Sequence, residues 1–304
     1  MDARRPSRTA LATAAARAAH LIVDRAPWIF EDRVAAVLLG ELAEDLLAAH
    51  RGADGSDVLA SMRVAMTARS RYTEDRLAEA CRQGIAQYVL LGAGLDSFAY
   101  RSALTARLRV YEVDHPATQA WKRRRLAAAG VRVPARVSFV AVDFRVDSLS
   151  DRLAEAGFDR AQPAFVSWLG VTQYLTAEAI AATLDAIASA WPGTELAMEY
   201  VVPPELRDEP GTALADFYIP RATELGEPWL TFMTPGDVAA LLGARGMTVI
   251  DDAGRREQVD AALWRRADGL RPHELGRVSH AVVPLSSAAA GAARTASPGR
   301  PGRA

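Results

Sequence analysis

Residues 87–101, QYVLLGAGLDSFAYR, decide the fold of this chain. The apolar run at 88–91 is typical of a parallel strand that helices cover on both faces. Gly92 and Gly94 then predict a sharp turn, because glycine adopts backbone angles closed to other residues and lets a ligand approach the main chain. Asp96 stands where a helix cap is expected. A strand, a glycine turn and a helix start together predict a cofactor cradle.

The glycine spacing separates two kinds of nucleotide cofactor. A dinucleotide fingerprint, G-x-G-x-x-G, requires glycine where this chain has Ser97. S-adenosylmethionine has no pyrophosphate, and its ribose hydroxyls need acceptors at the end of the second strand. Residues 109–114, RVYEVD, predict that strand, and Asp114 follows Gly94 at roughly the 20 residues that separate a glycine turn from a ribose-binding acid. Glu112 is the competing acid.

The chain on either side of this stretch predicts helices and further strands. Before it, we expect an alanine-rich helix at 9–19, a second helix after Pro27, and a third that continues from Ser56 or Asp57 to about residue 84. The second helix is expected to place four apolar residues toward the core, at Val34, Leu38, Leu42 and Leu46. After it, apolar runs at 137–142, 165–169 and 194–201 predict three more strands. Residues 1–8 and 286–304 are predicted to be disordered tails, because they lack the apolar residues needed to pack.

Four ordered motifs, GAGLDSFAYR, VYEVDHP, VAVDF and WLGVTQYL, resemble the leucine carboxyl methyltransferase-like family of class I S-adenosylmethionine-dependent methyltransferases. Within that family the chain is most similar to the actinobacterial branch that includes polyketide O-methyltransferases. The resemblance extends from about Ala26 to Leu285. It implies an α/β fold with a Rossmann-like, seven-stranded, mostly parallel sheet, helices on both faces and an N-terminal helical addition. The last two strands, at 247–250 and 278–285, are expected to form an antiparallel end.

The same resemblance implies a division of the chain. Residues 9–84 form a helical cap over the cofactor, and residues 85–285 form the S-adenosylmethionine-binding methyltransferase domain. An aromatic-containing insertion at about 203–233 is expected to shape the substrate site, although packing onto the domain needs the same residues.

Cofactor contacts follow from the residue chemistry and the resemblance together. A bidentate guanidinium suits the methionine carboxylate, and Arg69 fits the family position better than Arg71. Asp143 and Phe144 suit the amine and the face of adenine, and Trp168 suits the sulfonium. The full cofactor-binding set is Arg69, Gly92, Ala93, Gly94, Asp96, Asp114, Asp143, Phe144 and Trp168. Leu169 departs from the family, because many relatives have an acid there.

The expected reaction is O-methylation of a small molecule, such as a secondary metabolite, by in-line transfer from S-adenosylmethionine. A carboxylate acceptor needs no base, whereas a phenol or alcohol benefits from one. The candidate catalytic residues are Tyr174, His115 and Glu199. Two of them have a structural alternative: an aromatic core residue for Tyr174, and a histidine held by backbone partners for His115. The other functional hypotheses are a catalytically idle cofactor-fold protein that acts through partner binding, and a nicotinamide-dependent oxidoreductase.

Composition limits the partners. The formal charge of −1, from 36 basic and 37 acidic residues, provides no basic field for nucleic acid. A single cysteine excludes an intramolecular disulfide and fits a reduced compartment, and no apolar run approaches the roughly 18 residues of a membrane span. The five histidines do not gather with carboxylates, so no metal site is expected. We therefore expect a cytoplasmic enzyme with a small-molecule acceptor, and leave its oligomeric state open.

Overall fold

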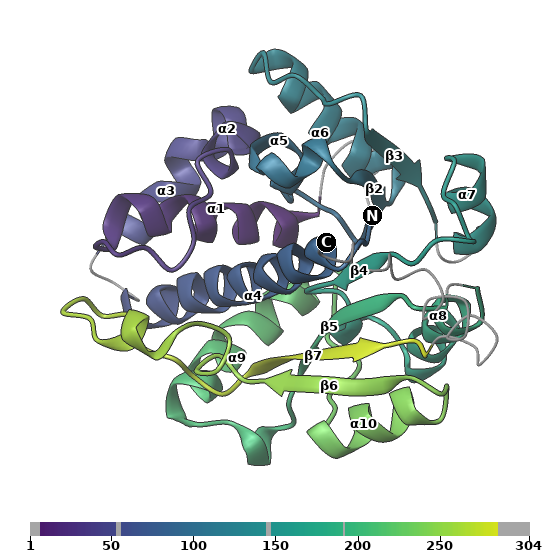
Figure 1. Cartoon of the computed structure of the whole chain (residues 1–304). Helices are drawn as coiled ribbons and strands as arrows, with labels where there is room; N and C mark the ends of the chain where they lie inside the picture. The colour runs from purple at the N-terminus through teal and green to yellow at the C-terminus, as the bar shows by residue number, and fades with distance from the viewer. Residues whose placement is uncertain (1–6, 53–55, 144–146, 191, 285–304) are drawn as a thin grey trace, which may run out of the picture.

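The computed structural model of the protein describes residues 7–52, 56–143, 147–190 and 192–284. Phe144 and most of both predicted tails lie outside these residues. A seven-stranded sheet crosses the molecule in the order β3-β2-β1-β4-β5-β7-β6 (Figure 1). Its strands are β1 (Gln87–Leu91), β2 (Arg109–Asp114), β3 (Val137–Ala141), β4 (Phe165–Trp168), β5 (Glu195–Val201), β6 (Thr248–Ala253) and β7 (Gly276–Val282).

The pairings confirm the mostly parallel sheet. Strands β1 to β5 pair in parallel with their neighbours, whereas β7 lies antiparallel between β5 and β6. The direction of strand order reverses between β1 and β4, so this is the switch point where open α/β sheets bind ligands. The antiparallel end expected from the family resemblance is present.

Helices cover both faces of the sheet. They are α1 (Arg8–Val23), α2 (Ala35–Leu39), α3 (Ala43–Arg51), α4 (Ser56–Arg82), α5 (Phe98–Arg101), α6 (Pro116–Ala128), α7 (Leu149–Glu155), α8 (Ala177–Ala190), α9 (Glu209–Glu224) and α10 (Pro235–Gly243). The described residues also form short 3₁₀ turns in the connections: η1 (Gly40–Leu42), η2 (Ala103–Ala106), η3 (Thr172–Tyr174), η4 (Pro204–Leu206) and η5 (Ala261–Trp264). In the described part of the chain, no helix has the length and apolar character needed to cross a membrane.

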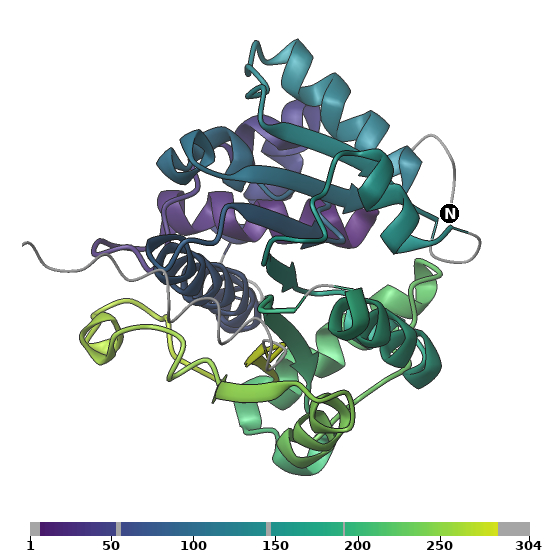
Figure 2. The same ribbon diagram turned by 45° about the vertical axis from the view of Figure 1, so that its right-hand side comes forward.

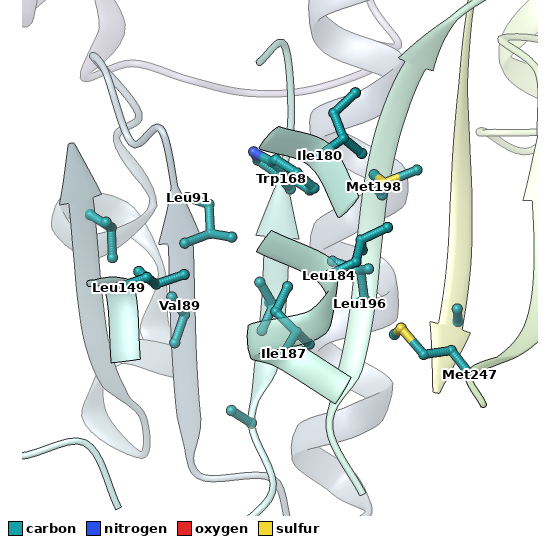
Figure 3. Packing of buried hydrophobic residues seen from close by; sticks show 14 of the residues in the cluster. Val89, Leu91, Leu149, Trp168, Ile180, Leu184, Ile187, Leu196, Met198 and Met247 are labelled. Carbon is teal, nitrogen blue, oxygen red and sulfur yellow. The ribbon is translucent and has the colours of Figure 1, made fainter. Parts of the chain in front are cut away.

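The central strand β1 packs against a helical layer on each side. Val89 and Leu91 join the core formed with α7, α8 and α10 (Figure 3). Tyr88 and Leu90 join the opposite core, which contains residues of α4 and α5. Because successive strand residues point to opposite faces, a strand buried on both sides is apolar over most of its length, here from Tyr88 to Leu91.

The N-terminal helices form the predicted addition beside the sheet. Helix α4 lies between α1 and α9 (Figures 1 and 2). The buried Arg17 of α1 donates from Nη2 to the Leu95 carbonyl oxygen at 2.7 Å and from Nε to Asp32 Oδ2 at 2.8 Å. This side chain joins the helical addition to the glycine turn.

Two expectations about this region are wrong. The tail predicted for residues 1–8 ends earlier, because α1 begins at Arg8 and the Ser7 side chain accepts a hydrogen bond from the Ala10 amide at 3.3 Å. The helix predicted after Pro27 is broken into α2, η1 and α3. Gly40 ends α2 with a φ of +59°, a left-handed conformation that glycine adopts readily.

Candidate functional site

A cavity of about 720 Å³ opens at the carboxyl ends of the parallel strands. Its wall is formed by the glycine turn, the ends of β2, β3 and β4, helices α1, α4 and α9, and the connections that follow α9 and β6. The volume lies within the range of small-molecule and cofactor sites. The N-terminal addition therefore forms part of the site.

Backbone hydrogen bonds hold the glycine turn against β2. The amides of Gly92 and Ala93 both donate to the Val113 carbonyl oxygen, at 2.9 and 3.0 Å. Gly92 has a φ of +71°, and a side chain there would collide with Val171. The turn thus needs glycine. Both residues, expected to bind the cofactor, line the cavity, while their amides bond the neighbouring strand.

Asp114 organises the cofactor end of the cavity. Its Oδ2 accepts the Gly94 amide at 2.5 Å and its Oδ1 accepts the His115 amide at 2.6 Å. Burial raises the pKa of Asp114, and these two hydrogen bonds act against that rise. Each carboxylate oxygen keeps a second lone pair, so the carboxylate can still accept ribose hydroxyls.

The competing acid, Glu112, has another partner. Its Oε2 lies 2.7 Å from the ammonium of Lys122, both side chains are 1% exposed, and Oε1 accepts the Tyr100 hydroxyl at 3.0 Å. Glu112 is absent from the cavity wall, whereas Asp114 forms part of it. The structure therefore favours Asp114 as the ribose acceptor.

Asp96, His115 and Asp143 complete this end of the wall. Asp96 Oδ1 accepts the Phe98 amide at 2.8 Å, at the start of a helix of only four residues. His115 Nδ1 accepts the Ala117 amide at 3.2 Å and caps α6. The Asp143 amide donates to Asp147 Oδ2 at 2.8 Å. His115, a base candidate, is thus the histidine held by backbone partners that the sequence also allowed.

Trp168 does not contact the cavity, so its expected contact with the cofactor is wrong. The side chain is 1% exposed and packs in the core beside Ile180 and Met198 (Figure 3). Its neighbours in the chain, Ser167 and Leu169, line the cavity instead. Side chains alternate between the faces of a strand, and Trp168 points to the face covered by α8.

At the end of β5, Glu199 lies between two arginines. Glu199 Oε2 is 2.5 Å from Arg69 Nη1, and its Oε1 bonds Arg255 Nη2. All three side chains are buried and line the cavity. Arg69 also passes close to Gly170, where a side-chain carbon would lie 2.9 Å from Nη1 and the φ of +69° also favours glycine. Two guanidiniums and one carboxylate leave one positive charge in this cluster.

Neither Glu199 nor Tyr174 is suited to act as a base. Burial acts to raise the pKa of Glu199, but Arg69 and Arg255 outweigh it, so the pKa lies below its ordinary value and the carboxylate is already paired. Tyr174 packs edge-on against Trp229, with ring centroids 6.4 Å apart. Burial raises the pKa of Tyr174, which keeps its phenol protonated at neutral pH. Both residues line the cavity, where they can bind rather than ionise a ligand.

Several wall residues were not identified from the sequence. Arg255 and His273 come from the connection between β6 and β7, and Thr9 and Glu227 join α1 to the loop after α9 through a 2.8 Å hydrogen bond. None belongs to a local motif. Tyr218 of α9, which donates to Met62 Sδ at 2.7 Å, lies in the aromatic insertion that was expected to shape the substrate site.

The ionised groups of the wall fit S-adenosylmethionine better than a dinucleotide. The wall contains five carboxylates, on Asp96, Asp114, Asp143, Glu199 and Glu227, and three guanidiniums, on Arg17, Arg69 and Arg255. S-adenosylmethionine carries a net positive charge, whereas the pyrophosphate of a dinucleotide is an anion. An excess of carboxylates attracts the first and repels the second. Among the described residues, no group of three or more histidine, cysteine, aspartate or glutamate side chains is arranged to hold a metal ion.

Sequence comparisons point in the same direction. Residues 10–188 match the family model described as leucine carboxyl methyltransferase. The Bacillus subtilis protein YktD, whose name describes an S-adenosyl-L-methionine-dependent methyltransferase, is 30% identical over 298 residues, which cover 91% of this chain and 97% of that protein. A Mycobacteroides abscessus protein with the same description is 34% identical over 268 residues, 84% of each chain.

Structural comparisons match the fold. A protein from Thermobifida fusca, described as a methyltransferase, has a TM-score of 0.56 and 20% identity, over 83% of this chain and 94% of that one. A DUF574-family protein from Streptomyces avermitilis has a TM-score of 0.59 and 15% identity, over 88% of this chain and 97% of that one. At these identities the likeness concerns the fold alone.

Proposed function

Because the chain belongs to the leucine carboxyl methyltransferase family and is an S-adenosylmethionine-dependent methyltransferase, we propose that it methylates an oxygen atom of a small molecule bound in the same cavity. The observation that carries the proposal is the continuity of the cavity. One wall joins the polar residues around Asp114 to an apolar region formed by α4, α9 and the connection before β7.

The polar end of the cavity holds the cofactor. The Asp114 carboxylate accepts the ribose hydroxyls, Asp143 pairs with the adenine amine, and Arg69 binds the methionine carboxylate. A guanidinium has five N–H donors, so Arg69 can contact Glu199 through Nη1 and still donate to a second carboxylate. When bound, S-adenosylmethionine supplies a methyl group activated by its sulfonium.

The apolar end holds the acceptor. Met62, Val201, Leu214 and Leu275 belong to one hydrophobic cluster, and the partly buried Tyr218 and Trp229 pack against it. All six line the cavity. Such a wall binds a compact apolar or aromatic body and excludes water, which brings the acceptor oxygen and the methyl group together. We therefore assign the insertion around α9 to the acceptor site.

Calorimetric titration with S-adenosylmethionine tests the cofactor site. Asp114→Asn keeps the shape of the side chain but removes its charge, and we expect its affinity to fall about 10- to 100-fold, because hydrogen bonds to a charged group contribute about 1.5–3 kcal/mol. Asp251→Asn is the matched control, because Asp251 lies on β6, away from the cavity wall, and accepts the Tyr72 hydroxyl at 2.8 Å. Its affinity should remain that of the wild type.

Release of S-adenosylhomocysteine with a panel of hydroxyl, carboxylate, amine and thiol acceptors tests the reaction. Turnover confined to oxygen acceptors is the expected result. Turnover only of amines or thiols would contradict O-methylation, and a preference for NAD in the titration would contradict the cofactor assignment itself.

A further inference from the structure

His273 presents an unusual buried nitrogen to this site. The side chain is 1% exposed, and its Nε2 lies 3.0 Å from the Ser61 carbonyl oxygen of α4. A carbonyl oxygen only accepts hydrogen bonds, so Nε2 carries the proton and Nδ1 has a free lone pair. Among the described residues, that Nδ1 has no hydrogen-bond partner. His273 forms part of the cavity wall.

Arg255 has the complementary feature. Its Nη1 donates to Gln258 Oε1 at 2.9 Å and its Nη2 bonds Glu199. Its Nε–H is buried and has no partner in the described part of the chain. Arg255 also lines the cavity, and its charge acts on His273. Gln173 Oε1 and Trp229 Nε1 of the wall also have no partner among the described residues, but His273 and Arg255 offer an acceptor and a donor on the same connection between β6 and β7.

Each of these orphaned groups is costly, since an unsatisfied buried polar atom costs about 1–3 kcal/mol. A hydroxyl group satisfies both, because it donates one hydrogen bond and accepts another. A carboxylate accepts only, so it has no proton to give to the Nδ1 lone pair. Apolar residues lie close by in the chain: Met62 follows Ser61, Leu275 lies two residues after His273, and both belong to the hydrophobic cluster of the acceptor wall.

Building on the proposed O-methylation, we propose that His273 is a catalytic residue: Nδ1 receives the proton of an acceptor hydroxyl while the Nε–H of Arg255 donates to the same oxygen. The acceptor class is then a phenol or an alcohol. The O–H bond breaks and leaves its electron pair on oxygen, and the proton goes to Nδ1. The O–CH₃ bond forms as the S–CH₃ bond breaks, which leaves a neutral thioether. The imidazolium then returns its proton to water.

The electrostatic surroundings keep the imidazole neutral before the reaction. Burial and the charge of Arg255 lower the pKa of His273 to about 4, against the opposing effects of the Ser61 carbonyl and of Asp208. Such a weak base does not ionise a bound hydroxyl beforehand. It can still take the proton during transfer, because the acceptor oxygen becomes strongly acidic as its bond to the methyl carbon forms.

The variant His273→Gln replaces the basic ring nitrogen by an amide, whose NH₂ can still donate to the Ser61 carbonyl but whose oxygen is too weak a base to take the proton. We expect kcat with hydroxyl acceptors to fall about 100-fold or more, the usual range for loss of a general base. Affinity for S-adenosylmethionine should stay within about twofold of the wild type, because His273 lies in the acceptor wall. Melting temperatures establish that the variant is folded.

His280→Gln is the matched control. His280 is also buried, its Nε2 lies 2.8 Å from Glu195 Oε2, and its Nδ1 also has no partner among the described residues. It lies on β7, outside the cavity wall. This variant should turn over hydroxyl acceptors at the wild-type rate, which separates a role in the reaction from the general cost of losing a buried histidine.

A second readout does not depend on turnover. In protein labelled with ¹⁵N-histidine and saturated with S-adenosylhomocysteine, the His273 Nδ1 resonance should be that of an unprotonated nitrogen and should shift when phenol is added. The His280 resonances should not move. Equal turnover of hydroxyls by wild type and His273→Gln would overturn the inference, and so would a His273 resonance that millimolar phenol leaves unchanged. Turnover of carboxylates alone would overturn it while leaving the proposed O-methylation intact, whereas turnover of no oxygen acceptor would contradict both.

Discussion

The two ends of the cavity are built in different ways. The proposed cofactor end is formed by residues 90–96, Asp114 and Asp143, all placed by consecutive strand ends. The acceptor end combines side chains from α4, α9 and the β6–β7 connection. His273 of that connection, for example, contacts Ser61, 212 residues earlier in the chain. The cofactor end is formed by residues close together in the chain, whereas the acceptor end is formed by segments that are distant in the chain.

That difference predicts different responses to mutation. A substitution at the cofactor end should lower the affinity for S-adenosylmethionine through the loss of single hydrogen bonds. A change at the acceptor end should act through packing and acceptor choice, because its residues are held by the fold rather than by a motif. The cluster of Arg69, Glu199 and Arg255 lies at the junction and connects the two ends.

The largest effect is therefore expected at this junction. Glu199→Gln leaves two buried guanidiniums without their carboxylate, and removal of one partner from a buried ion pair costs about 3–5 kcal/mol. Arg69→Met is the informative comparison, because it leaves Glu199 and Arg255 as a balanced pair. It should cost less stability but weaken S-adenosylmethionine binding about 10- to 100-fold.

Urea denaturation and calorimetric titration of the two variants measure these effects. Glu199→Gln should lose more free energy of unfolding than Arg69→Met. In Arg69→Met, the loss of binding free energy for S-adenosylmethionine should exceed the loss of free energy of unfolding. Equal stability of Glu199→Gln and wild type would show that the carboxylate does not balance the two arginines. Wild-type affinity of Arg69→Met would remove Arg69 from the cofactor site.

The next largest effect is the loss of stability at acid pH, which compares His273 in the acceptor wall with His50 in a structural position. Burial, with help from nearby arginines, lowers the pKa of both His50 and His273 to about 4. Both are bases that the folded protein keeps neutral, so their stability contributions are complete above the unfolded pKa of about 6.5 and are lost as the pH falls toward 4. Because the pKa falls from 6.5 to about 4 and one pKa unit equals about 1.4 kcal/mol, each contributes on the order of 3 kcal/mol.

Unfolding free energies measured between pH 4 and 7 test this assignment. His50→Gln and His273→Gln should each flatten the acid side of the wild-type curve to a similar degree. Only His273→Gln should also reduce hydroxyl methylation, because His50 of α3 is absent from the cavity wall. A loss of methylation in both variants would mean that the acid sensitivity, rather than the position of His273, explains the defect.

The sequence predicted the sheet and the link between the glycine turn and the second strand well, because both depend on residues close together in the chain. Residues 109–114 form β2 as expected, and Asp114 reaches Gly94 across the strand-turn-strand unit. The errors come from effects that local patterns do not contain. The side chain of Trp168, expected at the cofactor, packs on the face of β4 that α8 covers, and the helix expected after Pro27 is interrupted at Gly40.

The acceptor end was largely beyond sequence analysis for a physical reason. In the sequence, His273 has no nearby residue that marks it as part of a site. Its partner, the Ser61 carbonyl, is brought to it only by the packing of α4 against the connection between β6 and β7. Glu199 was considered as a base because its two arginines lie 130 residues before it and 56 residues after it in the chain. Their pairing, and hence the low pKa of Glu199, depends on the completed sheet.

The smallest expected effect lies where α1 meets the loop after α9. Glu227 Oε2 accepts hydrogen bonds from Thr9 Oγ1 at 2.8 Å and from Ser7 Oγ at 3.3 Å, and all three residues line the cavity. Glu227→Gln keeps one accepting oxygen but loses the charge, so the expected loss of stability is below about 1 kcal/mol. The clearer readout is faster hydrogen exchange in the first turn of α1, which this contact holds. Glu224→Gln, at the exposed end of α9, is the control. If both variants exchange at the wild-type rate, the contact does not restrain α1, and its first turn is held by the packing of Leu11 and Ala14 in the hydrophobic core.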